Sequence, residues 1–497
     1  MKLRVKDMDI ATGGIPVVIL NKKDARELDL HPMDRVVVKK NSKKIIATLD
    51  IAESHKAMPP GRIGLFEETL DAIHAKNNDK IKIDFAEKPE SITYIKKKMD
   101  GKKLNSKEIL CIIQDIVDSK LNDIELTSFI IASYTKGMDM EETAALTQAM
   151  VNTGEKLTFN KSPVVDLHSI GGVPGNRTTM LMVPILVAAG CIVPKTSSKA
   201  ITSPAGTADT MEVLCPVTHS VKHLKKIIDT VGGFIVWGGS INIAPADDII
   251  INVEKPLQID AQAQMLASIM AKKASVGATH LLLELPIGSG TKITTKKEAN
   301  KLKQSFEKLS KLLKIKIKIV ITNGTEAVGK GIGPILETRD VLWALQNKPE
   351  APKDLVQKSL KLTGILLEFV GKAKKGEGYK KAKQILESGK AYATMEKIVT
   401  AQSGKMIQPE QLKVALKTYD VKAKKTGKIY CLLNPTITKL ARLAGAPADP
   451  EAGVYIHKHC GENIVQGEPI LTIYSRSQKK LEYAKKALQK SGGIDII

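Results

Sequence analysis

The 497-residue sequence is poor in aromatic residues and has no closely paired cysteines. Phe, Trp and Tyr make up 4% of the chain, so the aromatic platforms on which single-stranded nucleic acids stack are scarce. No CxxC motif occurs, which argues against a zinc ribbon and a thioredoxin-like redox motif. The cysteines are scattered singly, and their odd number favours reduced thiols in a cytoplasmic protein. They are Cys111, Cys191, Cys215, Cys431 and Cys460.

Long hydrophobic segments are also lacking. The longest uncharged apolar run, Met180 to Pro194, is interrupted by prolines and is shorter than the ~20 residues that span a bilayer. Residues Met1 to Val5 alternate like a β-strand, without the apolar stretch of a signal peptide. We therefore expect no membrane partner.

The charge is strongly positive, at +23. This charge fits either a nucleic-acid binder or a lysine-rich surface around a site for anionic substrates. The lysines are spread along the whole chain, and the longest run is only Lys96 to Lys98. We favour the second interpretation and expect no nucleic-acid partner.

The length predicts several domains, since domains usually contain about 100–200 residues. Residues 1–84 alternate as in a β-rich domain, and residues 88–154 have helical periodicity. From Pro163 onward strands alternate with helices, which is typical of an α/β fold with a mostly parallel sheet. The tail from about residue 405 has mixed character, with predicted strands at Gly453–Ile456 and Pro469–Tyr474.

Caps and apolar runs define the expected elements more closely. Asn105 and Glu108 form a capping-box pattern that starts a helix. Other predicted helices cover residues 178–189, 220–231, 256–275 and 296–313. The predicted strands include residues 80–85, 191–193, 233–237, 280–285 and 315–321.

A glycine-rich loop between a strand and a helix is the first candidate site. After Asp166 come His168, Ser169 and the glycines of HSIGG, and Thr178 and Thr179 open the next helix. Phosphate binding needs inward-pointing N–H groups, hydroxyl donors and a helix N-terminus, and this loop offers all three. A tight turn without a ligand explains such a loop equally well. It matches neither the Walker nor the dinucleotide-binding pattern.

A second loop, Ser197 to Thr207, also follows a strand and precedes a helix. It contains several hydroxyl side chains, a lysine and a glycine. Two such loops at the carboxyl ends of strands in one parallel sheet face the same side, which raises the expectation of a shared anion site.

A polar stripe on the predicted long helix is the third candidate. Asp260, Gln264, Ser268 and Lys272 follow at four-residue spacing and share one face. For an arbitrary helix, a solvated face explains such spacing better than a site does. Apolar neighbours of Asp260 favour a raised pKa, as a general acid needs. The pair His219 and His223 has metal-ligand spacing but no third ligand, so we expect no metal site.

These motifs resemble the thymidine/pyrimidine-nucleoside phosphorylase family. The shared motifs, in order, are HSIGG from His168, SSKAITSPAGTAD from Ser197, DxxxxxxxSIMAKK from Asp260 and PIGSG from Pro286. The similarity covers roughly residues 88 to 475, and the extra N-terminal lobe resembles the archaeal-type AMP phosphorylase branch of that family.

The resemblance implies a small all-α domain beside a large α/β domain, with a cleft that closes on substrate. The small domain would comprise residues 88–154 and 245–275, and the large domain residues 160–244 and 276–400. Residues 405–497 would form a barrel-sandwich-like α+β domain. Residues 1–84 would form an N-terminal β-rich domain for assembly into a homodimer or a larger homo-oligomer.

Departures from the nucleoside branch point to a nucleotide substrate. That branch usually has arginine and threonine where this chain has Lys199 and Pro204. It reads its pyrimidine with an arginine, a serine and a lysine. Ser268 and Lys272 match two of these, with Lys272 on the base side, but the arginine position falls at or next to Val253.

The AMP branch implies a set of substrate-binding residues and phosphorolysis of AMP, with CMP and UMP as further candidates. Asp260 corresponds to its proton donor. Phosphate would be held by Ser169, Thr179 and Ser197 together with members of the nucleotide set, while His168 contacts phosphate or base or only orders the loop. The implied nucleotide set is Gly172, Ser198, Lys199, Ala200, Ile201, Thr202, Ser203, Thr207, Ser268 and Lys292.

The implied partners are AMP and inorganic phosphate, and no metal or organic cofactor is expected because phosphate is itself the nucleophile. A pyrimidine-nucleoside phosphorylase remains the main alternative. A phosphoribosyltransferase of related architecture, which requires magnesium, and a basic nucleic-acid-binding protein are the others.

Overall fold

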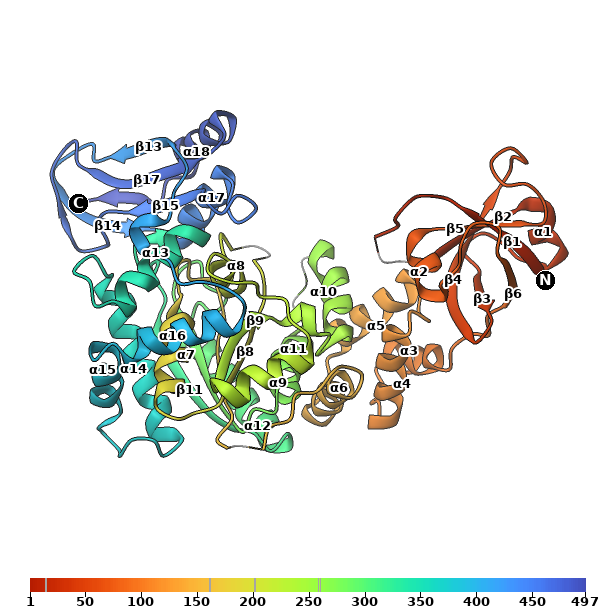
Figure 1. Cartoon of the computed structure of the whole chain (residues 1–497), viewed down its shortest axis with the longest axis horizontal. Coiled ribbons are helices and arrows are strands. Elements are labelled where there is room, and N and C mark those ends of the chain that lie inside the picture. Colours follow the sequence, from red (N-terminus) through yellow and green to blue (C-terminus); the bar gives the residue numbers. More distant parts are fainter. Residues whose placement is uncertain (14–15, 161, 201–202, 258, 260) are drawn as a thin grey trace. The chain divides into compact units, whose positions relative to one another are not determined.

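The structure is a computed structural model that describes residues 1–13, 16–160, 162–200, 203–257, 259 and 261–497. The chain divides into two compact units, whose elements are labelled in Figure 1. The first unit contains Met1–Thr153 and Pro245–Ala267, and the second contains Gly154–Ala244 and Ser268–Ile497. None of the described helices has the length and apolar character needed to cross a membrane.

The N-terminal part of the first unit is a closed β-barrel with the strand order β1-β5-β2-β4-β3-β6. Strand β1 closes the barrel by pairing parallel with β5 and antiparallel with β6. Leu3 and Val5 of β1 are buried, while Lys2 and Arg4 between them are exposed, as the alternation predicts. The elements are β1 (Lys2–Asp7), β2 (Val17–Asn21), α1 (Lys22–Glu27), β3 (Arg35–Lys40), β4 (Lys43–Ala52), β5 (Arg62–Leu65), α2 (Glu67–Ile73) and β6 (Lys80–Phe85).

The rest of the first unit is helical. Asn105 and Glu108 form the predicted capping box at the start of α4. Helix α10, from the second segment of the unit, packs against α4, α5 and α6. The helices are α3 (Ser91–Met99), α4 (Ser106–Val117), α5 (Asp123–Lys136), α6 (Met140–Asn152) and α10 (Pro245–Leu257).

A parallel sheet forms the centre of the second unit, which confirms the predicted α/β class. Strands β11, β10 and β7 pair in this order, and β8 pairs with β9. A parallel bridge between Val164 and Ile192 joins the two groups beside β7 and β8. The strands are β7 (Val165–Ser169), β8 (Val193–Ser197), β9 (Gly233–Trp237), β10 (His280–Ile287) and β11 (Lys316–Asn323).

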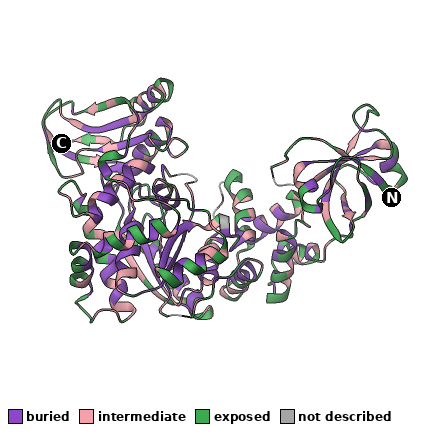
Figure 2. Cartoon of the chain, in the orientation of Figure 1, coloured by how far each residue is buried: buried purple, intermediate pink, exposed green. Residues whose placement is uncertain are grey.

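Helices cover this sheet, and α7 is its most apolar neighbour. The segment Met180–Leu186 of α7 is buried on all sides and packs against α14 and α16 (Figure 2). The helices are α7 (Thr178–Ala188), α8 (Thr207–Glu212), α9 (Val221–Thr230), the 3-10 turn η1 (Gly238–Ile241), α12 (Lys296–Leu312), α13 (Pro334–Leu345), α14 (Lys353–Phe369), α15 (Gly378–Glu387) and α16 (Lys390–Ala401). Helix α11 (Gln262–Ser275) belongs to the first unit up to Ala267 and to the second unit from Ser268 onward.

Two of the predicted elements are wrong. The single helix expected over residues 256–275 is two helices, because α10 ends at Leu257 directly after Pro256 and α11 begins at Gln262. The strand expected at 191–193 begins at Val193 and continues through Lys195 to Ser197. Hydrophobicity alone places the end of this strand too early, because its last three residues, Lys195 to Ser197, are polar.

The C-terminal part of the second unit is an α+β arrangement. The predicted strands Gly453–Ile456 and Pro469–Tyr474 correspond to β15 and β17, which pair antiparallel. The elements are η2 (Pro409–Gln411), β12 (Gly331–Ile332), β13 (Lys417–Lys422), β14 (Gly427–Leu432), α17 (Asn434–Ala444), β15 (Gly453–Ile456), β16 (Asn463–Ile464), β17 (Pro469–Ser475), α18 (Gln478–Ser491) and β18 (Ile494–Ile496).

Candidate functional site

The predicted loops follow neighbouring parallel strands of the second unit. His168 and Ser169 end β7, and Ser197 ends β8. Strand β10 lies on the other side of β7, with Glu284 opposite Ser169. The carboxyl ends of these strands lie at one edge of the sheet, where open α/β folds bind ligands.

Gly172 brings the first loop against the segment after β10. Its φ is +97°, and a Cβ added there would lie 2.7 Å from Thr291 Cα and 2.9 Å from Lys292 N. Only glycine fits a backbone packed this closely in this conformation. The approach places the backbone of Lys292, a predicted nucleotide residue, directly beside the loop.

A polar network fixes Ser169. Its Oγ accepts a hydrogen bond from Asn176 Nδ2 at 3.3 Å, and the same amide donates to Glu284 Oε2 at 3.2 Å. Glu284 is buried, accepts from the Thr322 hydroxyl at 2.6 Å and pairs with Lys358 Nζ at 2.7 Å. Burial opposes ionisation of Glu284, but Lys358 and the hydrogen bonds keep its pKa below the ordinary value. The Ser169 hydroxyl is therefore held in place through Asn176 and the buried ion pair of Glu284 with Lys358.

Asp209 closes the second loop. Its Oδ2 accepts from the N–H groups of Ala200 and Gly206, both at 2.7 Å. Gly206 packs so closely that a Cβ would lie 2.5 Å from the carbonyl oxygen of Ser198. The Ser203 hydroxyl donates to Ala205 O at 3.1 Å. Ile201 and Thr202, two predicted binding residues, lie outside the described residues.

Arg177 joins the two loops, although no motif in the sequence marks it as a site residue. Its Nη1 donates to Thr207 Oγ1 at 3.0 Å and its Nη2 to Ala205 O at 3.1 Å. The same guanidinium forms an ion pair with Glu337 of α13. Burial raises the pKa of Glu337 to about 7, against the charge of Arg177. The end of the first loop therefore sets the position of the Thr207 hydroxyl in the second.

A buried charge cluster lies under the first loop. Asp166 is fully buried, with Lys273 Nζ 2.8 Å from Oδ2 and Lys195 Nζ 3.5 Å from Oδ1. Lys195 also donates to the carbonyl oxygens of Leu167 and Thr196, each at 2.9 Å. Burial and the charge of Lys273 lower the pKa of Lys195 to about 7.

The surroundings of His168 lower its pKa and so favour the neutral imidazole. Burial and then the charges of Lys273, Lys195, Lys272 and Lys292 lower its pKa well below the ordinary value. Lys272 and Lys292, two predicted site residues, thus lie close enough to act on this imidazole. A neutral ring offers one donor and one acceptor to a ligand.

The other predicted residues occupy mixed positions. Thr179 is half-buried in the first turn of α7, and Ser268 is half-buried on α11. Lys199 pairs with Glu212 at 2.7 Å, and its Nζ lies 5.3 Å from the centroid of the Trp237 ring. Asp260, the predicted proton donor, lies outside the described residues.

The histidine pair His219 and His223 has backbone partners. The ring centroids are 5.0 Å apart, and each Nε2 lies about 3 Å from a carbonyl oxygen, that of Pro216 or Ala401. Within the described part of the chain, no three His, Cys, Asp or Glu side chains gather as metal ligands.

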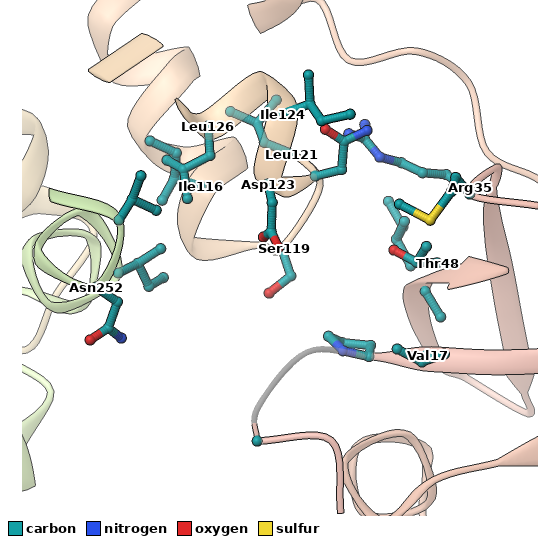
Figure 3. A pocket seen from close by; sticks show the side chains of 18 of the residues that line it. Val17, Arg35, Thr48, Ile116, Ser119, Leu121, Asp123, Ile124, Leu126 and Asn252 are labelled. Atoms are coloured by element: carbon teal, nitrogen blue, oxygen red, sulfur yellow. The ribbon is translucent and has the colours of Figure 1, made fainter. Parts of the chain in front are cut away.

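A cavity of about 590 Å³ lies in the first unit between the barrel and helices α5 and α10 (Figure 3). Arg35 and Thr48 line it from the barrel, and Asn252 and Val253 line it from α10. Arg35 forms an ion pair with Glu125 of α5. Among the described residues, none of the predicted site residues lines this cavity.

Models of protein families match three segments of the chain. Residues 92–154 match the glycosyl transferase family helical bundle domain, and residues 161–277 match the α/β domain of the same family. Residues 432–495 match the pyrimidine nucleoside phosphorylase C-terminal domain.

Curated relatives match nearly the whole chain. An AMP phosphorylase of Methanococcus maripaludis (strain C6) is 43% identical over 479 residues, which is 96% of this chain and 94% of the relative. Those of Thermococcus kodakarensis and Pyrococcus furiosus are 43% and 42% identical over 485 residues, which is 97% of this chain and 95% of each relative.

Solved structures share the fold at low identity. Anthranilate phosphoribosyltransferase from Thermus thermophilus is 18% identical, with a TM-score of 0.53, and covers 62% of this chain and 99% of its own. The Saccharomyces cerevisiae enzyme, solved with PRPP and Mg, is 16% identical with a TM-score of 0.50, covering 63% of this chain and 98% of its own.

Proposed function

Because the chain belongs to the AMP phosphorylase family, we propose that it cleaves AMP with inorganic phosphate to adenine and ribose 1,5-bisphosphate. The observation that best supports this reaction is the pair of loops after β7 and β8, joined by the hydrogen bond from Arg177 to Thr207. Two hydroxyl- and glycine-rich loops at one sheet edge suit a reaction with two phosphate-bearing substrates, here AMP and inorganic phosphate.

Inorganic phosphate is assigned to the first loop. Ser169, Gly172 and Thr179 would hold it from the loop and from the N-terminus of α7, and Ser197 and Thr207 from the second loop. The partial positive charge of a helix N-terminus favours an anion there. The fixed position of Ser169 beside Asn176 and the close packing of Gly172 support this assignment, because a preorganised cradle loses little entropy on binding.

The nucleotide is assigned to the second loop and to two lysines. Ser198–Ser203, Ser268 and Lys292 would bind AMP, and Lys272 would lie on the base side. Lys199 and Lys292 are the candidates for the 5′-phosphate. Lys199 would exchange its partner Glu212 for the phosphate, which its partial exposure of 38% allows.

The proposed chemistry needs one nucleophile and one acid. A phosphate oxygen bonds to the anomeric carbon as the C–N bond breaks, through an oxocarbenium-like transition state that the phosphate dianion stabilises. The bonding electrons leave with adenine, and a proton from Asp260 to a ring nitrogen neutralises it. Such general acid catalysis contributes ~10²–10⁴-fold.

The role of Asp260 is tested by Asp260→Asn. This variant should lose most turnover while keeping its affinity for phosphate, as measured by calorimetry. Near-normal phosphorolysis by the variant would assign the proton transfer to another group.

The substrate is tested by phosphate-dependent release of free base from AMP, CMP, UMP, adenosine and thymidine. We expect release from the nucleotides, with AMP included, and little from the nucleosides. Turnover of thymidine without a 5′-phosphate would favour a pyrimidine-nucleoside phosphorylase. Base release that needs magnesium and diphosphate instead of phosphate would favour a phosphoribosyltransferase.

We also propose that no metal or organic cofactor takes part and that the protein is a cytoplasmic homo-oligomer. Phosphate as nucleophile removes the need for a cofactor, so exhaustive treatment with EDTA should leave phosphorolysis unchanged. Light scattering of the purified protein would give a dimer or a larger assembly.

A further inference from the structure

Gln264 is a buried amide without a hydrogen-bond partner. Its side chain is 2% exposed, and neither Oε1 nor Nε2 has a partner. Among the described residues, no other side chain has two buried polar atoms in this state. Leaving a buried amide unsatisfied costs about 1–3 kcal/mol, and native proteins rarely keep such a group without a use for it.

Gln402 shows how the same protein treats a structural buried glutamine. Gln402 is fully buried, and its Oε1 accepts from Ile235 N at 2.9 Å. Its Nε2 donates to Ile235 O at 2.9 Å and to Pro216 O at 3.2 Å. The contrast indicates that Gln264 is kept for a partner that is not part of the chain.

The position of Gln264 on its helix relates it to the proposed site. Gln264 lies within α11, one turn before Ser268 and two turns before Lys272. Residues four apart in an α-helix lie on one face. Gln264 therefore shares a face with the residues assigned to the nucleotide and its base.

We propose that Gln264 reads the base of the substrate, an inference that rests on the proposed function. An amide presents a donor and an acceptor side by side. Its Oε1 would accept from the N6 amine of adenine while its Nε2 donates to the adjacent ring nitrogen, a pairing known from DNA recognition. Cytosine presents the same pattern, and uracil presents its reverse, which a rotated amide matches. One residue would thus accept the bases of AMP, CMP and UMP.

The test compares AMP with purine riboside 5′-monophosphate, which lacks the exocyclic amine. Gln264→Leu replaces the amide by an apolar group of similar size. In the wild type, kcat/KM should favour AMP, and the variant should shrink this discrimination about 10- to 100-fold. The KM for phosphate should stay within about 2-fold. The Tm should stay equal or rise, because an unsatisfied amide is removed.

Gln262→Leu is the matched control, since Gln262 lies on the same helix but is exposed. It should leave the discrimination unchanged. An unchanged discrimination in Gln264→Leu, or an equal loss on both substrates with a lower Tm, overturns the proposal. If the wild type releases no base from AMP, the proposed function itself fails. Calorimetric binding of the two nucleotides to the wild type and to Gln264→Leu then decides whether Gln264 reads the base.

Discussion

Lys273 Nζ lies 2.8 Å from Asp166 Oδ2, and this ion pair ties helix α11 to strand β7. Both side chains are almost fully buried. Helix α11 carries Ser268 and Lys272, and β7 leads into the first loop, which is assigned to phosphate and is called the phosphate loop below. The pair therefore fixes the distance between the residues assigned to the nucleotide and those assigned to phosphate.

Lys273→Met should destabilise the protein strongly. Removing one partner of a buried ion pair leaves an uncompensated charge and costs about 3–5 kcal/mol. Chemical denaturation measures this loss in the free energy of unfolding. Lys297→Met removes an exposed lysine and should change stability by less than about 0.5 kcal/mol. Similar values for the two variants would show that Lys195 alone satisfies Asp166.

The stability of the wild type relative to Lys195→Met should depend on pH. Burial and the charge of Lys273 lower the pKa of Lys195 to about 7, whereas an unfolded lysine titrates near 10.4. Between these values the unfolded chain binds a proton that the folded protein has released, so stability rises with pH. The difference in unfolding free energy should shift by about 2 kcal/mol in favour of the wild type from pH 7 to pH 9. A difference that is constant over this range would mean that Lys195 stays protonated in the fold.

Local sequence patterns predict much of this fold. The strands Lys80–Phe85 and Gly233–Trp237 have the expected bounds because apolar residues and turn signals mark both ends. The capping box at Asn105 fixes the start of α4 in the same way. These features depend on residues that are close in the sequence, so the sequence alone predicts them.

The pairing of strands that are distant in the sequence cannot be predicted in this way. Nothing near β1 indicates that it pairs with both β5 and β6 and so closes the barrel. The polar end of β8 looks unlike a buried strand because it contains Lys195. This buried lysine is accommodated by Asp166 on the neighbouring strand β7 and by the carbonyl oxygens of Leu167 and Thr196. The loops of the site are recognisable from the spacing of their glycines and hydroxyl residues. The role of Arg177 is not recognisable, because its position depends on an ion pair with Glu337, which is distant in the sequence.

Gly172→Ala and Gly171→Ala form a matched pair for the phosphate loop. At Gly172 a Cβ would lie 2.7 Å from Thr291 Cα with φ at +97°, whereas at Gly171 it would meet nothing within 4 Å. Gly172→Ala should cost about 1–3 kcal/mol of stability from backbone strain and raise the KM for phosphate. Gly171→Ala should leave the Tm nearly unchanged. Equal Tm values for both variants would show that the loop adapts without strain.

Arg177→Lys should weaken phosphate binding through the second loop. A lysine cannot reproduce the fork that holds Thr207 Oγ1, Ala205 O and Glu337 together. We expect the KM for phosphate to rise about 10-fold, the equivalent of one hydrogen bond to a charged group.

Arg339→Lys is the control for that change. Arg339 lies on the same helix as Glu337, but its guanidinium stacks on Trp343, with 4.9 Å to the ring centroid. Its replacement should cost some stability and leave the KM for phosphate unchanged, because it holds neither loop. If both variants raised the KM equally, the effect would come from a displaced α13 rather than from the position of the Thr207 hydroxyl. If instead only Arg177→Lys raises the KM, Thr207→Ser, which keeps the hydroxyl, should bind phosphate like the wild type, while Thr207→Val should behave like Arg177→Lys.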